Sequence, residues 1–343
     1  MQDAGYGIQD TGYRIQDTGC RAWLGVGVWG GEVVGKLEDA GVKKGAGLTT
    51  GVLKEVSRSF YLSLRFLPKG FRAPVSLGYL LARASDTIAD AGDWSVEERR
   101  ELLERFVGWV NGGAALPIPP GGGLPEGERV LLERLDECVA GLEELPEWQR
   151  ASVRKVVAII TEGQRWDLDR FEGEGVVGME KDEELRDYTY RVAGCVGEFW
   201  TEIGFGVDPG FAEGSREEMM AWGQAYGRSL QLINILRDVP EDLTNGRCYL
   251  PGAKTNEELL AERQRWVDEA RAGLDQADRY ARALRGKRLR FATVLPAMIG
   301  RKTLDRLEGT SWDEWEARVK VSRREVYQLM AQAARFALWG PSL

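Results

Sequence analysis

The stretch Tyr226–Pro251 reads YGRSLQLINILRDVPEDLTNGRCYLP, and it decides how the rest of the chain is interpreted. Gln231, Asn234, Asp238 and Asp242 stand three, four and four residues apart, which places them on one face of an α-helix. Leucines and isoleucines fill the positions between them, so this helix is predicted to be buried. Because a buried carboxylate is costly unless it is paired or binds a metal, the polar face is predicted to line a cavity that holds cations.

A second stretch, Ser76–Asp90, has the same character and reads SLGYLLARASDTIAD. Tyr79, Arg83, Asp86 and Asp90 are spaced four, three and four residues apart, again on one helical face with leucine and isoleucine on the others. Two such helices predict two aspartate pairs that face each other across a cavity. Since the chain contains no histidine, the pairs favour a hard cation such as Mg²⁺, which commonly bridges carboxylates to substrate phosphates.

A single DxxxD is also typical of a solvated charged face or of the first turn of a helix. Here, however, each motif lies on an apolar helix and has an arginine beside it, Arg83 in the first and Arg237 in the second. Guanidinium groups suit diphosphate oxygens, so the two motifs together favour a diphosphate and metal site.

Four segments in this order resemble the squalene/phytoene synthase family, and the resemblance runs from Ser57 to the region of Pro296. The segments are SRSFY at Ser57–Tyr61, YLLARASDTIAD at Tyr79–Asp90, YTYRVAGCVG at Tyr188–Gly197 and QLINILRDVPEDLTNGRCYLP at Gln231–Pro251. The resemblance implies a class I isoprenoid synthase-like helical bundle with a central cavity. It also implies the head-to-head condensation of two prenyl diphosphates, in which Mg²⁺ neutralises the leaving diphosphate.

The first three segments are most similar to the squalene synthases, which implies farnesyl diphosphate as substrate, a presqualene-type diphosphate as intermediate and NADPH as reductant. Phytoene or dehydrosqualene synthesis without a reductant is the alternative within the family. A helical lipid or prenyl-carrier protein is the alternative outside the enzymes, and it would not need all four aspartates. A di-iron carboxylate bundle normally needs histidine and is nearly excluded.

The resemblance also implies roles for individual residues. The expected metal ligands are Asp86, Asp90, Asp238 and Asp242. The expected catalytic residues are Tyr79, Arg83 and Tyr188, and the expected substrate-binding residues are Ser57, Arg58, Ser59, Phe60, Gln231, Asn234, Arg237 and Arg247. Without the resemblance, Ser57–Ser59 would be interpreted as a helix cap and the two tyrosines as core residues that merely satisfy their hydroxyls.

Residues 1–44 are predicted to lie outside the folded domain. They begin with three polar, glycine-bearing repeats of seven residues, DAGYGIQ, DTGYRIQ and DTGCRAW, which lack the apolar seam of a coiled coil. The GxGxxG at Gly25, Gly27 and Gly30 has no strand before it and no βαβ pattern around it, so it is interpreted as part of a glycine-rich linker. This segment is expected to be disordered and dispensable, and residues 45–343 are expected to form a single all-α domain.

Composition restricts the location and the partners. The net charge of −8 over 343 residues argues against general nucleic-acid binding. The four cysteines show no CxxC and are interpreted as free thiols in a reducing compartment. No run approaches a membrane span and no secretory signal is evident, so we expect a cytoplasmic monomer. The basic stretch Arg279–Arg306 is interpreted as a solvated helix face, with peripheral contact to the anionic inner surface of the membrane as the alternative.

The hydrophobic periodicity is helical almost throughout from Leu48 onward, and no convincing strand is predicted. Pro240 is predicted to kink or end its helix because it lacks the N–H that would bond the Leu236 carbonyl. The predicted helices are Val52–Phe66, Ala73–Ala91, Val96–Val110, Arg129–Leu142, Glu147–Phe171, Lys181–Gly204, Ser215–Asp242, Glu257–Arg285, Arg290–Leu307 and Ser322–Leu338.

Overall fold

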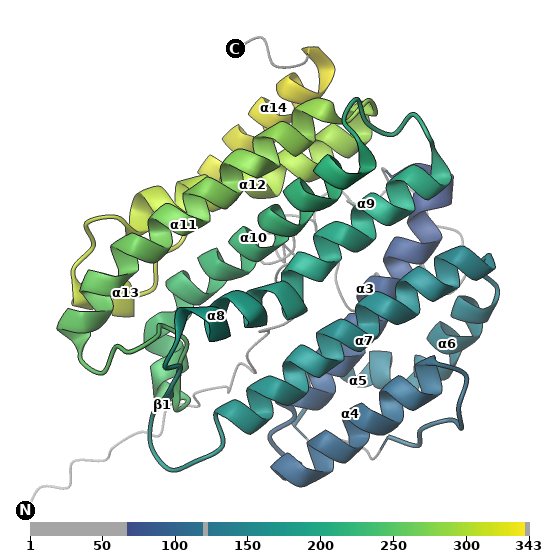
Figure 1. Cartoon of the computed structure of the whole chain (residues 1–343). Coiled ribbons are helices and arrows are strands. Elements are labelled where there is room, and N and C mark those ends of the chain that lie inside the picture. Colours follow the sequence, from purple (N-terminus) through teal and green to yellow (C-terminus); the bar gives the residue numbers. More distant parts are fainter. Residues whose placement is uncertain (1–66, 119–122, 340–343) are drawn as a thin grey trace, which may run out of the picture.

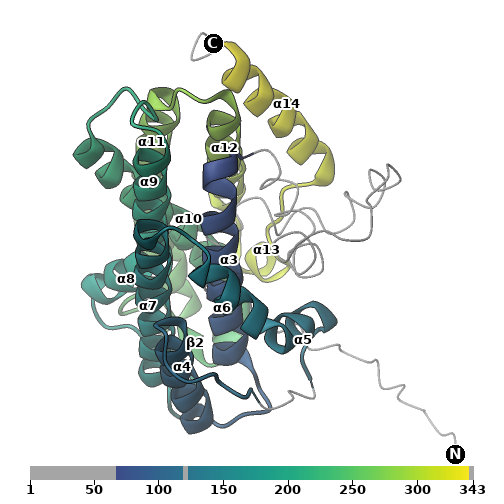
Figure 2. The same ribbon diagram turned by 90° about the vertical axis from the view of Figure 1, so that its right-hand side faces the viewer.

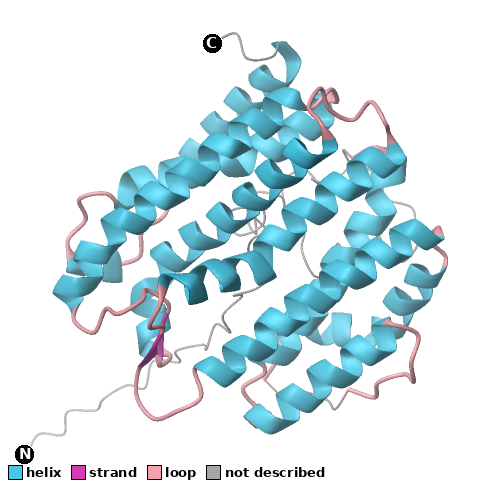
Figure 3. Cartoon of the chain, in the orientation of Figure 1, coloured by secondary structure: helices cyan, strands magenta, loops and turns pink. Residues whose placement is uncertain are grey.

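The structure is a computed structural model that describes residues 67–118 and 123–339. The predicted helix Val52–Phe66 and the whole of residues 1–44 lie outside the described residues, so the expected domain boundary stays a prediction. The described elements are α3 (Lys69–Asp90), α4 (Val96–Val110), α5 (Glu126–Glu133), α6 (Leu135–Glu143), α7 (Glu147–Arg170), β1 (Val177–Gly178), α8 (Asp182–Thr189), the π-helical turn η2 (Tyr190–Gly194), α9 (Cys195–Val207), α10 (Arg216–Thr244), β2 (Arg247–Cys248), α11 (Asn256–Ala283), α12 (Lys287–Leu307), α13 (Trp312–Glu316) and α14 (Arg323–Trp339). Figures 1 and 3 show an almost entirely helical bundle, which confirms the predicted all-α class.

The helices form a bundle with two large hydrophobic cores. The first core joins α3, α4, α6 and α7 to α9, and the second joins α8, α10, α11 and α12. The α10 helix lies between α9 and α11 and packs against both, and α14 packs on α12 at the edge of the bundle (Figure 2). The helix that carries the second aspartate motif is therefore enclosed by other helices, as its apolar sequence predicts.

Most of the predicted helices in this part of the chain are confirmed, α4 with the predicted bounds. The predicted helix Arg129–Leu142 is instead two helices, because Arg134 leaves helical geometry with φ −111° and ψ 21°. The predicted helix Lys181–Gly204 contains the π-helical turn η2, which adds a residue to the turn immediately after Tyr188.

Two further features differ from the prediction. The α10 helix does not end at Pro240 but continues through it to Thr244, and the other predicted outcome, a kink at Pro240, stays a prediction. A short parallel pair, β1 with β2, joins Val177 to Arg247 and Gly178 to Cys248. Each strand has only two residues, which is too short for an alternating pattern in the sequence.

The start of α10 is set by a capping box. The Ser215 hydroxyl accepts a hydrogen bond from the Glu218 amide at 3.1 Å, and the Glu218 carboxylate accepts one from the Ser215 amide at 3.1 Å. Such reciprocal bonds satisfy backbone donors that the first turn leaves unpaired. The same arrangement begins α4, α11 and α13.

Glycines let α10 approach the segment that follows Tyr188 backbone to backbone. A Cβ atom added at Gly227 would lie 2.2 Å from the Ala193 carbonyl oxygen in η2, and one added at Gly197 would lie 1.9 Å from the Gly223 carbonyl oxygen. No side chain fits in either place, so this crossing depends on glycine. Its consequence is that η2 and the start of α9 are held against α10 at Gly223 and Gly227.

Among the described residues, no helix combines the length and the apolar character that crossing a membrane requires.

Candidate functional site

The first aspartate motif lies at the end of α3 and is largely buried. Asp86 is 1% exposed, and its carboxylate forms an ion pair with Arg83 at 3.2 Å. The other guanidinium nitrogen of Arg83 donates to Glu128 in α5 at 2.6 Å. Gln164 of α7 donates to the second Asp86 oxygen at 3.4 Å. The expected arginine neighbour is therefore confirmed as a contact, and Arg83 is shared between two carboxylates.

The second motif is buried in the same way on α10. Gln231, Asp238 and Asp242 are each at most 6% exposed, and Asn234 is half-buried. Arg237 holds both oxygens of Asp238, with Nε–Oδ1 at 2.8 Å and Nη2–Oδ2 at 2.5 Å. A two-pronged pair of this kind fixes both side chains.

Helix α7 joins the two motifs, a role that the sequence did not suggest. Gln164 contacts Asp86 of the first motif. One turn later, Asp167 accepts hydrogen bonds from Arg247 at 2.8 Å and from Tyr249 at 2.7 Å, both in the segment that follows the second motif. Because residues three apart on a helix share a face, the first aspartate motif and the segment that follows the second motif both contact one side of α7.

Charge interactions show the same convergence. The Asp90 carboxylate, at the last residue of α3, raises the pKa of Arg247, although burial opposes this and Asp167 contributes more. Asp90 also acts on Arg99 of α4, whose pKa is lowered overall by burial. Arg247 therefore pairs with Asp167 and is also influenced by the Asp90 charge.

Tyr188 is 2% exposed and belongs to an aromatic cluster beside Asp167. Its ring stacks on Tyr249 with centroids 5.2 Å apart and lies 5.8 Å from Trp166. Burial, followed by the Asp167 charge, raises the pKa of both tyrosines well above the ordinary value. Burial also raises the pKa of Asp167, although Arg247 and the tyrosine hydroxyls oppose this. Both phenols are therefore neutral at pH 7.

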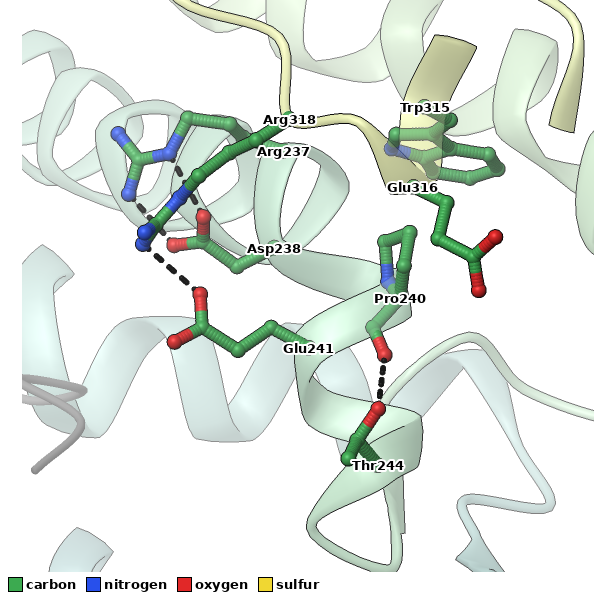
Figure 4. A pocket seen from close by; sticks show the side chains of 8 residues that line it. All are labelled: Arg237, Asp238, Pro240, Glu241, Thr244, Trp315, Glu316 and Arg318. Atoms are coloured by element: carbon green, nitrogen blue, oxygen red, sulfur yellow. Dashed lines mark hydrogen bonds and ion pairs between the residues drawn. The ribbon is translucent and has the colours of Figure 1, made fainter. Parts of the chain in front are cut away.

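A cavity of about 260 Å³ opens beside the second motif (Figure 4). Arg318, which follows α13, reaches over α10 to form an ion pair with Glu241 at 2.8 Å. Figure 4 shows its side chain beside that of Arg237. Arg318 has φ of +74°, a strained conformation for a residue with a side chain, and such strain clusters at functional sites. The cavity thus holds two guanidinium groups next to Asp238.

The donor set fits Mg²⁺ in its chemistry. All four motif carboxylates supply hard oxygen ligands. Within the described ranges, no three His, Cys, Asp or Glu side chains are grouped closely enough to hold a metal ion by themselves. In its usual mode of binding, Mg²⁺ is held by one or two carboxylates together with substrate phosphates, and binding by these four aspartates stays a prediction.

The structure pairs Asp86 with Arg83 and Asp238 with Arg237, and the expected site as a whole stays a prediction. Tyr79 is 1% exposed within the first hydrophobic core. Four of the predicted substrate-binding residues lie outside the described residues: Ser57, Arg58, Ser59 and Phe60. Sequence reasoning missed Asp167 and Arg318. Gln164 and Asp167 share a helical face with the apolar residues Ile160 and Leu168, which was a signal for the former, whereas no local pattern marks Arg318.

Comparisons with known proteins identify the family of this chain. The family of squalene/phytoene synthases matches residues 53–325. The chain belongs to this family. Presqualene diphosphate synthase of Zymomonas mobilis is 34% identical over 197 residues, which cover 57% of this chain and 56% of that protein. The 15-cis-phytoene synthase of Synechocystis is 27% identical over 306 residues and 82% of each chain.

Solved structures confirm the fold. TcSQS in complex with the ligand BPH1237 has a TM-score of 0.68 at 20% identity and covers 83% of this chain and 85% of that one. Squalene synthase HpnC from Alicyclobacillus acidocaldarius has a TM-score of 0.51 at 19% identity and covers 80% and 92%. The chain thus has the squalene synthase-like fold, and the roles of its individual residues stay predictions.

Proposed function

We propose that this protein condenses two farnesyl diphosphates head to head into presqualene diphosphate, and that squalene forms from this intermediate when NADPH is supplied. The observation that supports it most is that one face of α7 contacts both the first aspartate motif, through Gln164, and the segment that follows the second motif, through Asp167. Similarity to the presqualene diphosphate synthase of Zymomonas mobilis points to the same first product.

Each motif presents a carboxylate already paired with an arginine, Asp86 with Arg83 and Asp238 with Arg237. In our proposal a bound diphosphate replaces these carboxylates as the partner of the two guanidinium groups. Guanidinium groups bind phosphate oxygens with charge-assisted hydrogen bonds. When bound by Asp86, Asp90, Asp238 and Asp242, Mg²⁺ would supply Lewis-acid neutralisation of the leaving diphosphate. Arg318 is added to the diphosphate contacts because it lies in the same cavity as Arg237.

Tyr188 is assigned to the reacting ends of the substrate because its ring stacks on Tyr249, in the segment that follows the second motif. Burial and the Asp167 charge raise its pKa well above the ordinary value, so it is not a base at neutral pH. The proton lost in the condensation therefore leaves with the released diphosphate. The apolar cores on either side exclude water from the carbocations.

The NADPH assignment has a weaker basis. The strands named in the described ranges are two residues long and form no βαβ unit, so those ranges offer no dinucleotide fold of that type. The NADPH assignment rests on the resemblance to the squalene synthases.

Location and surface contacts also remain proposals. Within Arg279–Arg306, Arg301 forms ion pairs with Asp275 and Asp278, and Arg306 forms one with Glu325. These contacts support a solvated helix face over an anionic membrane surface. That the protein is a cytoplasmic monomer remains a proposal from its sequence.

The test is product analysis of the full chain with Mg²⁺ and farnesyl or geranylgeranyl diphosphate, each with and without NADPH. We expect presqualene diphosphate from farnesyl diphosphate alone and squalene when NADPH is added. A product mixture that ignores NADPH contradicts the squalene step.

Phytoene synthesis is the second candidate because the similarity to the Synechocystis phytoene synthase extends over 82% of each chain. Efficient turnover of geranylgeranyl diphosphate would favour it. If neither substrate is consumed while a prenyl ligand still binds, the protein is a carrier.

A further inference from the structure

A second cavity lies where α8, α10 and α11 meet. Its volume is about 340 Å³, which is within the size range of ligand-binding pockets. Its α10 residues include Ser229 and Leu232, which lie on a different side of that helix from Gln231 and Asp238. The cavity beside the second motif and this one have no described lining residue in common. The second cavity is therefore separate from the site proposed for the reaction.

Arg228 is a charged group in this cavity without a direct partner. Its side chain is half-buried, and within the described ranges its guanidinium group forms no hydrogen bond and no ion pair. Glu269 lines the same cavity, but Arg186 holds both of its carboxylate oxygens, at 3.1 and 2.8 Å. Burial lowers the pKa of Arg228, and the Arg186 charge lowers it further, although Glu269 and Asp187 oppose this. The cavity therefore contains a positive charge that no carboxylate contacts directly.

Trp266 adds a second hydrogen-bond donor without an acceptor. Its side chain is 0% exposed and lines the cavity, and among the described residues its Nε1 has no hydrogen-bond partner. Arg186 and Arg265 lie over its ring, with their Cζ atoms 5.4 and 4.6 Å from the ring centroid. Neither arginine can satisfy Nε1, because a guanidinium group donates hydrogen bonds and accepts none.

The remaining wall of the cavity is either satisfied or apolar. The Thr189 and Ser229 hydroxyls donate to backbone carbonyl oxygens at 3.0 and 2.6 Å. Leu185 and Leu232 supply apolar surface. The chemical complement of such a cavity is an oxyanion joined to an apolar group, since the oxyanion accepts hydrogen bonds and pairs with the guanidinium group, while the apolar group is removed from water.

We propose that this cavity is a second binding site, which takes an organic anion: a phosphate or carboxylate group attached to a short apolar chain. Arg228 binds the oxyanion, because its planar guanidinium group matches carboxylate and phosphate oxygens. Leu185 and Leu232 contact the apolar chain. The site is independent of the proposed function, because none of its described lining residues belongs to the expected metal, catalytic or substrate-binding residues.

The test measures the binding of hexyl phosphate and of hexanoate to the full chain by isothermal titration calorimetry. EDTA is present, so that no metal ion assists binding at the aspartate motifs. We expect saturable one-to-one binding, and the tighter of the two probes identifies the head group as phosphate or carboxylate. Inorganic phosphate and hexanol each lack one half of the ligand and should bind at least about tenfold more weakly. No saturable binding of either probe, or equally tight binding of hexanol or inorganic phosphate, overturns the proposal.

A pair of variants locates the binding. Arg228→Met removes the charge and should weaken the binding of the tighter probe by about ten- to a hundredfold. Arg216→Met is the matched control, because Arg216 is in the first turn of the same helix, is 53% exposed and lies 3.9 Å from its partner Glu202. It should bind the probe as the wild-type chain does. Wild-type affinity in Arg228→Met, or an equal loss in Arg216→Met, overturns the proposal.

If Arg228→Met does not fold, Ala272→Leu replaces it. Ala272 of α11 lines the cavity and is exposed, so a larger side chain there occupies the cavity without entering a hydrophobic core. This variant should also bind the probe at least about tenfold more weakly, through lost apolar contact and restricted access, and unchanged affinity overturns the proposal. If the wild-type chain converts no prenyl diphosphate, the proposed function fails, while these binding measurements still decide whether the second site exists.

Discussion

Gly227→Ala is predicted to destabilise the protein and to impair the site, although alanine is the better helix former. The added Cβ would lie 2.2 Å from the Ala193 oxygen, whereas ordinary contact begins at 3.4 Å, so the backbones of α10 and η2 must separate by about 1.2 Å. Overpacking of this kind costs about 1–3 kcal/mol. It exceeds the gain in helix propensity, which is at most about 1 kcal/mol.

The separation also affects function. Ala193 follows Tyr188 by five residues and Gly227 precedes Gln231 by four, so both sides of the displaced crossing carry site residues. A misplacement of about 1 Å can cost roughly a hundredfold in rate. We therefore expect kcat to fall by about ten- to a hundredfold.

Gly108→Ala provides the matched control. Gly108 lies inside α4, and a Cβ there meets no atom within 4 Å. This variant should gain about 0.5–1 kcal/mol in the free energy of unfolding. Thermal unfolding by circular dichroism should therefore shift in opposite directions for the two variants, by about 2–4 °C per kcal/mol. A Gly227→Ala protein that melts at or above the wild-type temperature with unchanged kcat would refute the reasoning.

Four further predictions address the rest of the chain. Asp238→Asn should abolish turnover with an unchanged circular dichroism spectrum, because the amide keeps the shape but not the charge that binds Mg²⁺; activity near the wild-type level would mean that this carboxylate is not a ligand. Arg318→Met should raise KM for farnesyl diphosphate about tenfold through the lost charge-assisted contact, and an unchanged KM would remove Arg318 from the diphosphate site. A chain that begins at Gly45, without residues 1–44, should keep full helicity and activity, and a large loss of either would contradict the predicted domain boundary. Burial raises the pKa of the Cys138 thiol to about 12, so iodoacetamide at pH 8 should leave it unmodified in the native protein but not after unfolding, as peptide mass spectrometry would report.

The helical part of the fold could be predicted from local patterns. The bounds of α4 follow from its amphipathic period and the capping box at Ser95. The burial of Asp86 and Asp238 follows from polar faces at helical spacing in apolar stretches. In each case the deciding interactions lie within a few residues, so the sequence alone contains them.

The site as a whole was decided by the tertiary structure. Asp167 meets Arg247 and Tyr249 across about 80 residues, and Arg318 reaches Glu241 from a segment after α13. The π-helical turn after Tyr188, the two-residue strands and the continuation of α10 through Pro240 also depend on neighbours far away in sequence. Local periodicity predicts which face of a helix is polar, but tertiary packing determines the partner of that face. The reason is that the burial energy depends on the whole set of helices that enclose the face.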